Sequence, residues 1–590
     1  MSASHERSTL APSLYAYAKG LRDSAPDAPL PRQGLPLPEH ARPPRVRAGG
    51  PGPQEARAVV TDLLLPFPAL PDPERAAAEV ERTLARAGVR ERAVFAAVTA
   101  IPPSRESAAR SRARALGRHL TRGGTTFGAV AAGLGLLSRL GEPEDVPYVR
   151  TLGLLEGLGQ YATATLEPLD PASAALVWLV HRARGDALRG LVDALATGDE
   201  AAVRDLLPEL PTAPRELGPE HARRVAEAVG LPELLRREPD HPGLLAQAVR
   251  LLTRMCSGRG YENEILEYDE AVALYETVGA RAHELSPLLD HQALLVTLAL
   301  ELHSGAAHLL PWPPGRRRHV GGALLAAVEE PDTPPDREGR RRADWIRRTV
   351  RRLCEAAPVT PSAAPRLRIE VVVADPGDPD GVETRFLVDG RPLVPAAFGR
   401  GPGEPPERLL DDGALRAGPE PREVRLAEAY CTEGCCGALY VTVRREGPHV
   451  VWDGWRRPGT PPGLPALPAA YRFDAAAYDT EIARAERDRD WSWPARDTAR
   501  LIAAGLRERP GLLARWGLRQ GWAGTAFGDP DTAVVTYADL PPTTGGRQGA
   551  PPRQYLWHLP EDGTPPERRA ADALRRFAEE DPRGFPEPAG

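Results

Sequence analysis

The chain has 590 residues, 42% of them hydrophobic and 26% charged, which is a balance typical of a globular protein. This length is too great for a single hydrophobic core and predicts about two to four domains. The formal net charge of -6 is small for this size. The overall field therefore gives no reason to expect a nucleic acid or an anionic membrane as a partner.

The cysteine content favours a reducing compartment. Five cysteines, an odd number in a long chain, argue against a disulfide framework. The first twenty residues contain no apolar leader. The longest apolar runs fall short of the roughly 18 residues that a membrane span needs. We therefore expect a cytoplasmic protein that does not enter a membrane.

Lys19 is the one lysine in the sequence, so nearly every positive charge is an arginine. A P-loop, a protein kinase and a pyridoxal phosphate enzyme each need a lysine in a particular setting, and "AYAKGL" provides none of these settings. The sequence also lacks the G-x-S-x-G and H-E-x-x-H motifs. These absences argue against several large classes of enzyme.

The first part of the chain is predicted to be helical after a proline-rich start. Residues 1–54 are expected to be disordered or extended, because the prolines of "APLPRQGLPLPEHARPP" lack amide donors and its few apolar residues could not offset the entropy lost on ordering. Residues 55–357 repeat helical patterns of 13 to 20 residues that end in Gly or Pro, as in "PERAAAEVERTLARAG". This pattern predicts an all-α, solenoid-like helical-repeat region. A linker is expected at 358–365.

One segment of this region, "LGEPEDVPYVRTLGLLEGLGQYATATLEPL", resembles a HEAT-type helical repeat. Asp145 and Val146 would open its helix after a short acidic turn, and Leu152, Leu154 and Leu155 would lie on the core side. The resemblance implies a binding scaffold, since most HEAT-like proteins are scaffolds and a minority act on DNA bases.

Residues 366–590 are predicted to form an α+β domain with an antiparallel sheet. Short β-branched or aromatic runs such as "RLRIEVVVAD", "ALYVTVRR" and "HVVWDGW" read as strands. Asp389-Gly390 is a two-residue hairpin signal. Three helices are expected, in "FDAAAYDTEIARAERD", "WPARDTARLIAAGLRERPGLLARWG" and "TPPERRAADALRRFAEEDP". The fold class is thus multidomain, all-α followed by α+β.

The turn "CTEGCCG" contains Cys431, Cys435 and Cys436 between two predicted strands. Three interpretations are open: a zinc site, a redox pair, or small apolar side chains packed in a turn. His449 is the nearest further ligand in sequence, but a strand rising roughly 3.3 Å per residue would separate it from the turn. The sequence favours packing of small apolar side chains. If the turn does bind a metal, Cys431, Cys435 and Cys436 are the candidate ligands.

The run from Tyr430 through "CTEGCCGALYVTVRR" to Trp452, followed by "YRFDAAAYDTEI", resembles a Cys-rich hairpin and FD-x-x-x-Y element of uncharacterised proteins from GC-rich bacteria. Phe473, Asp474 and Tyr478 form the second part of this pattern. The resemblance covers most of 366–590. It implies a genuine domain and no particular activity.

Other constellations favour structural over functional interpretations. Gly157 to Ala162, "GLGQYA", matches G-x-G-x-x-A, but it lies among helices and not after a strand. Eight arginines between Arg337 and Arg352 permit phosphate contact, yet Trp345 and Ile346 predict an amphipathic helix that docks between the two halves of the chain.

Side chains of three further groups were weighed in the same way. The functional alternatives are a metal site for the histidines, a surface for a basic partner for the acidic set, and a ligand platform for the tryptophans; a solvated or core role is preferred for each. The groups are His283, His291, His303 and His308 with Glu284, Asp290 and Glu301; the acidic set Glu262, Glu264, Glu267, Asp269 and Glu270; and the tryptophans Trp452, Trp455, Trp491, Trp493, Trp516, Trp522 and Trp557 with Asp453 and Asp490.

The sequence thus predicts a non-catalytic interaction or scaffold protein whose partner is another protein. One alternative is a hydrolase or transferase with Asp453, Asp474 or the cysteine turn as catalytic groups in the C-terminal region. A second alternative is a nucleic-acid binder that uses the arginine-rich helix. No cofactor is expected apart from a possible zinc ion at the cysteine turn.

Overall fold

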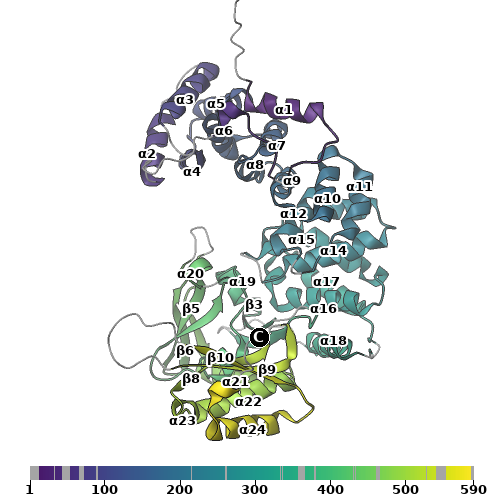
Figure 1. Cartoon of the computed structure of the whole chain (residues 1–590), viewed down its shortest axis with the longest axis vertical. Coiled ribbons are helices and arrows are strands. Elements are labelled where there is room, and N and C mark those ends of the chain that lie inside the picture. The colour runs from purple at the N-terminus through teal and green to yellow at the C-terminus, as the bar shows by residue number, and fades with distance from the viewer. Residues whose placement is uncertain are drawn as a thin grey trace, which may run out of the picture. The chain divides into compact units, whose positions relative to one another are not determined.

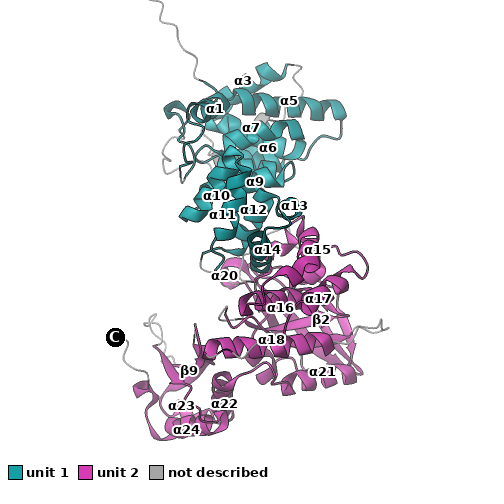
Figure 2. Ribbon diagram, turned by 90° about the vertical axis from the view of Figure 1, so that its right-hand side faces the viewer, with its two compact units in different colours: residues 1–254 teal, residues 255–590 magenta. Residues whose placement is uncertain are grey.

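The chain divides into two compact units. A computed structural model describes residues 12–31, 33–42, 53–64, 72–87, 91–213, 216–258, 262–331, 334, 336–355, 366–377, 381–429, 431, 433–459, 466–526, 528–539 and 553–585. The units are Met1–Arg254 and Met255–Gly590, which Figure 2 draws in teal and magenta. The linker predicted at 358–365 lies outside the described residues; the last helix before it ends at Glu355 and the first strand after it begins at Leu367, both in the second unit.

The described residues of the first unit form helices. Their β-pairing is limited to one isolated bridge, between Leu35 and Leu155. Polar and glycine caps set the helix ends: the Asp170 side chain accepts from the backbone N of Ser173 at the start of one helix, and Gly198 ends the next with a φ of 77°. The helices are α1 Leu14–Ser24, α2 Pro53–Leu64, α3 Pro73–Ala87, α4 Glu91–Ala100, α5 Ser107–Gly123, α6 Phe127–Leu140, α7 Val146–Gly153, α8 Gly159–Leu166, α9 Pro171–Arg182, α10 Asp186–Thr197, α11 Glu200–Leu206, α12 Pro219–Val229, α13 Leu231–Arg237 and α14 Pro242–Met255.

Helices of this unit pack on near neighbours in the chain, with α5 on α6, α7 on α8, α8 on α9 and α9 on α12. In the segment that resembles a HEAT repeat, α7 begins at Val146 as predicted. Leu152, Leu154 and Leu155 are all buried, which confirms their predicted core position. Each helix thus buries its apolar face against adjacent helices.

Part of the segment predicted to be disordered or extended packs against the helices. Leu14 and Leu37 are buried in the same cluster as α6, α7 and α8. The backbone N of Leu35 donates to the carbonyl of Leu154 at 2.7 Å. The proline content suggested too few apolar contacts for order, but these side chains find a core in residues more than a hundred positions later.

The second unit begins with helices α15 Ala271–Arg281, α16 Leu289–Ser304, α17 Arg316–Ala326 and α18 Arg337–Glu355. In α18, Trp345 and Ile346 are buried with Ala293 and Val296 of α16. The Trp345 Nε1 donates to the carbonyl of Val373, in the first strand, at 2.9 Å. The arginine-rich segment is therefore the amphipathic docking helix that the apolar stripe predicted.

Three antiparallel sheets follow, with strand orders β1-β2-β3, β4-β5-β6-β7 and β10-β9-β8. Figure 1 draws this part of the chain in green to yellow. Asp389 and Gly390, with φ of 52° and 77°, form the predicted two-residue hairpin between β2 and β3. The strands are β1 Leu367–Val373, β2 Val382–Val388, β3 Arg391–Pro392, β4 Arg422–Glu428, β5 Ala438–Glu446, β6 His449–Arg456, β7 Tyr471–Asp474, β8 Leu518–Ala526, β9 Asp529–Asp539 and β10 Gln554–Pro560; the helices among them are α19 Leu393–Ala397, α20 Glu433–Cys436, α21 Ala475–Arg487, α22 Pro494–Glu508, α23 Gly511–Ala514 and α24 Pro566–Glu579.

Two hydrophobic cores support these sheets. The sheets β1–β3 and β4–β7 share one core with α21, in which the Trp452 ring lies edge-on to Phe386 at 5.8 Å and to Phe473 at 5.6 Å. The sheet β8–β10 packs on α22 and α24 around Tyr537 and Phe577. The predicted fold class, a helical region followed by an α+β region with antiparallel sheets, is confirmed. No helix in the described ranges is both long enough and apolar enough to cross a membrane.

Candidate metal centre

The cysteine turn closes the β4–β5 hairpin. The ladder ends at the pair Glu428 and Ala438, and the backbone N of Ala429 donates to the carbonyl of Gly437 at 3.0 Å. Gly437 has a φ of 99°, a conformation that glycine adopts without strain. This glycine turns the chain from the single helical turn α20 back into β5. The short turn α20 carries Cys435 and Cys436.

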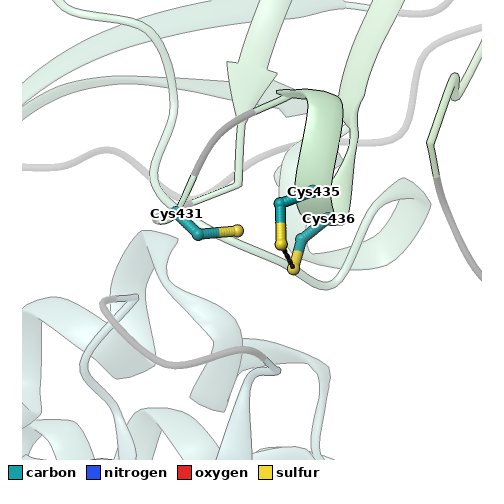
Figure 3. Close-up of side chains that lie close together, drawn as sticks. All are labelled: Cys431, Cys435 and Cys436. Atoms are coloured by element: carbon teal, nitrogen blue, oxygen red, sulfur yellow. Dashed lines mark hydrogen bonds between the residues drawn. The ribbon is translucent and has the colours of Figure 1, made fainter.

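The three thiols of this turn converge. The Sγ atoms of Cys431, Cys435 and Cys436 all lie within 4.8 Å of one another. The Sγ atoms of Cys435 and Cys436 are 3.7 Å apart. Figure 3 shows the three side chains directed toward one another from the loop and from α20. From the sequence these three cysteines were candidate metal ligands, with packing preferred; the described part of the chain holds no second group of three that could bind a metal.

The cysteines differ in their exposure and protonation. Cys436 is buried, with 9% of its surface exposed; Cys431 is half-buried and Cys435 is exposed. The hydrogen bond with Cys431, burial, and the hydrogen bond with Cys435 raise the pKa of the Cys436 thiol to about 12. Without a cation the cluster therefore keeps the Cys436 proton, since one thiolate disfavours the next. A bound cation would reverse this balance.

Three carboxylates beside the turn pair with the same arginine, Arg425. Arg425 pairs with Glu404 at 2.5 Å, with Glu428 at 3.0 Å and with Glu433 at 3.7 Å. The carboxylate of Glu428 also accepts from the backbone N of Glu433 at 2.9 Å, which fixes the start of α20. These contacts hold the turn in place from the β4 side.

Contacts from β5 and β6 hold the other side of the turn. The Tyr440 hydroxyl donates to the Glu433 carboxylate at 2.8 Å. The Arg456 guanidinium lies 4.8 Å from the centroid of the Tyr440 ring, and Glu423 binds it in two contacts of 2.6 and 2.8 Å. The turn is thus part of an ordered surface network and not a bare loop.

The distances between the sulfur atoms suit a thiophilic metal ion. A tetrahedral ion with metal–sulfur bonds of about 2.3 Å places its sulfurs about 3.8 Å apart. The 3.7 Å between the Sγ atoms of Cys435 and Cys436 matches this spacing, and the Sγ of Cys431 lies within 4.8 Å of both. Thiolate donors select Zn²⁺, Cu⁺ or iron–sulfur chemistry over Mg²⁺ or Ca²⁺.

Two features argue against a redox-active pair. Reactive dithiols carry a thiol with a depressed pKa, whereas the pKa of Cys436 is raised. Cys435 and Cys436 are neighbours in sequence, and the roughly 3.8 Å between adjacent Cα atoms is shorter than the separation of most disulfides. None of the five cysteines, all of which lie in described ranges, forms a disulfide.

His449 lies at the opposite end of the hairpin. It pairs with Glu446 at the β5–β6 turn, whereas the cysteines precede Ala438 at the start of β5. A strand of nine residues, about 30 Å long, therefore separates His449 from the thiols. The distance argument made from the sequence is confirmed.

The candidate catalytic aspartates do not join the cysteines. Asp453 accepts from the Nη2 atom of Arg444 at 2.6 Å. Asp474 caps α21 by accepting from the backbone N of Ala477 at 2.9 Å, and it pairs with His449 at the far end of the hairpin. In the FD-x-x-x-Y element, Asp474 is thus a helix cap. Phe473 and Tyr478 are buried core residues.

Arginines of α18 bind acidic groups of the same unit. Arg341 pairs with Asp531 at 2.9 Å, Arg342 pairs with Asp375 at 2.5 Å and Arg352 pairs with Asp488 at 3.2 Å. These contacts run to β9, to the end of β1 and to the end of α21. They occupy charges that a phosphate backbone would need.

The histidines of the predicted cluster have separate partners. His303 contacts the Glu370 carboxylate at 3.1 Å, His308 contacts the carbonyl of His303 and His291 contacts the carbonyl of Ser286. Glu301 is buried against Arg385 at 2.5 Å. These side chains serve packing and pairing, as the preferred interpretation stated.

The acidic segment and the tryptophans also have mainly structural roles. Glu262 pairs with Arg400 at 2.9 Å, and Glu264 is buried. Trp452, Trp491 and Trp557 lie in the cores of the second unit. Trp522 is the exception, with 48% of its surface exposed on β8. The "GLGQYA" match spans the join of α7 and α8, with no strand before it.

The sequence did not predict the buried ion pairs of Arg385. Arg385 of β2 bridges Glu301 of α16 and Glu383, beside a small cavity that Cys256 also lines. Glu301 was considered as a metal ligand, but neither Arg385 nor Cys256 was singled out. Because Arg385 and Glu301 are 84 residues apart, no local sequence pattern predicts their contact.

Comparison with known proteins gives no relative. No family model matches the chain, and neither a curated protein nor a solved structure matches it.

Proposed function

We propose that the chain is a non-catalytic interaction protein that carries a zinc ion at the cysteine turn. The observation that supports it most is the convergence of three thiols within 4.8 Å at a partly exposed turn. Packing alone would favour three buried cysteines, whereas Cys435 is exposed. The partner is another protein.

The helical region is the second part of this proposal. A HEAT-like array presents a broad surface made of adjacent helices, and such surfaces suit protein partners. The ordered packing of α5 to α9 on near neighbours is compatible with this reading. The α+β region would provide a second recognition surface around the cysteine turn.

The zinc site is tested by elemental analysis of the untagged, purified chain. We expect about one zinc per chain, lost in Cys431→Ser, Cys435→Ser and Cys436→Ser. Cys354→Ser is the matched control, because Cys354 is an exposed cysteine that is not in the cluster. A metal-free protein whose cluster variants unfold like the parent would refute the zinc site.

The interaction role is tested by crosslinking in an extract of source cells, followed by reconstitution from purified components. We expect a partner that forms a complex of fixed stoichiometry with the full chain. A chain that finds no such partner and instead turns over a hydrolase or transferase substrate would favour the enzyme alternative. The separated positions of Asp453, Asp474 and the cysteines support the non-catalytic reading.

The nucleic-acid alternative predicts binding through α18. Because Arg341, Arg342 and Arg352 already pair with carboxylates, we expect no binding of duplex DNA at moderate salt. Fluorescence anisotropy with labelled duplex measures this. Binding that persists at 200 mM salt and falls in Arg348→Ala would revive the alternative.

A further inference from the structure

The fourth ligand of the proposed zinc ion is the open question at the cysteine turn. We infer that three thiolates of this chain hold the ion and that its fourth coordination position takes an imidazole nitrogen from outside the chain. This inference rests on the proposed zinc site and extends it to a ligand class.

The described chain offers no fourth ligand at the cluster. The other two cysteines are elsewhere: Cys256 is buried beside the Tyr275 hydroxyl, and Cys354 lies at the end of α18. No histidine or carboxylate among the described residues joins the three sulfurs. In the sequence, Cys431 is flanked by Tyr430 and Thr432, neither of which is a usual zinc ligand.

The position of the cluster makes the ion accessible. Cys435 is exposed and Cys431 is half-buried, so an ion among the three sulfurs would face solvent on one side. Structural zinc sites are closed by four protein ligands, whereas sites with three protein ligands keep one position open. The three-thiolate turn belongs to the open kind.

The charge around the turn favours a neutral donor. A zinc ion with three thiolates carries a net charge of about -1. Glu404 pairs with Arg408 and with Arg425. Glu428 and Glu433 also pair with Arg425, so three carboxylates near the turn share this one arginine. A fourth thiolate would add negative charge beside these carboxylates. An imidazole nitrogen adds none and completes a Cys₃His set.

Cobalt(II) in place of zinc provides the test, since its visible bands report geometry and ligand type. The full-length chain is loaded with one cobalt and titrated with imidazole and, separately, with 2-mercaptoethanol. We expect a saturable shift of the bands with imidazole and a weaker response to the thiol. A dilution series of the loaded protein shows whether a histidine of a second copy fills the position, since the bands then change with protein concentration.

The outcomes separate the two proposals. If no cobalt binds, or if binding survives in Cys431→Ser and Cys436→Ser, the zinc site itself fails. If cobalt binds through the cysteines but neither titrant nor dilution moves the bands, the position is closed and this inference is overturned. A shift with 2-mercaptoethanol alone would overturn the choice of a neutral donor. Cys354→Ser should behave as the parent in every arm.

Discussion

Cys436 combines two roles at the residue scale. Its side chain belongs to the core shared by β1–β3 and β4–β7, while its Sγ faces the sulfurs of Cys431 and Cys435. The same burial and hydrogen bonds raise the pKa of this thiol to about 12. The charge of the proposed zinc ion would favour its thiolate form. Packing and ligation are therefore compatible at this position.

A second residue pair links α16 to β1 and gives a pH-dependent prediction. The Nε2 atom of His303 lies 3.1 Å from the Glu370 carboxylate. Burial would raise the pKa of Glu370, but the hydrogen bond with His303 and the charges of Arg368 and Arg352 outweigh it and lower this pKa. A lowered folded-state pKa stabilises the fold above the unfolded value of about 4.3 and loses that effect as the pH falls through the folded value.

Glu370→Gln should therefore lower the free energy of unfolding by about 2 kcal/mol at neutral pH. The difference from the parent should shrink as the pH falls below the unfolded value and through the lowered folded pKa of Glu370, since below that pKa both chains carry a neutral side chain. Urea unfolding at several pH values measures this, with the exposed Glu330→Gln as control. A difference that stays constant with pH would mean that the carboxylate charge contributes nothing.

At the scale of elements, arginines of α5 bind the turn that starts α7. Asp145 is fully buried and accepts from the Nε atom of Arg118 at 2.8 Å and the Nη2 atom of Arg122 at 3.0 Å. It also accepts from the backbone N of Glu142, which completes a capping box. One carboxylate thus fixes both the helix start and the packing of α5.

Asp145→Asn should destabilise the first unit by about 3 kcal/mol, because it leaves two arginines without their buried counter-charge. Glu144→Gln is the matched control: Glu144 also pairs with Arg118, but its side chain is 63% exposed, so its loss should cost less than about 1 kcal/mol. Thermal unfolding followed by far-UV circular dichroism measures both. Equal effects of the two changes would contradict this assignment.

Elements with strong periodicity were predictable and irregular ones were not. The strands β1, β5 and β6 and the docking helix α18 were expected from their patterns. The strand β8 was not predicted because "LRQGWAGTA" contains two glycines, which are uncommon inside strands. At Gly521 a side chain would collide with Thr536, so the strand needs a glycine there. Pro510 divides the single helix expected after Trp493 into α22 and α23.

The site was only partly predictable for a similar reason. The spacing of Cys431, Cys435 and Cys436 placed them in one turn between two strands. Their convergence depends on the single helical turn α20 and on the contacts of Glu433, which come from Glu428, Arg425 and Tyr440. Side chains from the two strands β4 and β5 set that geometry, and no local pattern encodes it.

At the scale of the whole molecule, α15–α18 belong to the same compact unit as the sheets. The buried pair Glu301 and Arg385 joins α16 to β2 at 2.5 Å, and Trp345 of α18 donates to the carbonyl of Val373 in β1. Burial alone would lower the pKa of Arg385, but Glu301 and Glu383 outweigh it and keep this guanidinium charged. Removing the helices would leave these groups without partners.

Residues 255–590 expressed alone should therefore unfold cooperatively, at a temperature close to that of the second unit in the full chain. Residues 366–590 should be markedly less stable, because they lack the helices that cover Val373 and pair with Arg385. Differential scanning calorimetry compares the two. Equal stability would place the folding boundary at 358–365, as the sequence alone suggested.

The most direct test of the central claim is X-ray absorption spectroscopy at the zinc edge of the full-length, zinc-loaded chain. The account predicts three sulfur neighbours at about 2.3 Å and one lighter nitrogen or oxygen neighbour at about 2.0–2.1 Å. Four sulfur neighbours, or a shell of nitrogen and oxygen alone, would contradict a zinc ion held by Cys431, Cys435 and Cys436 with an open fourth position.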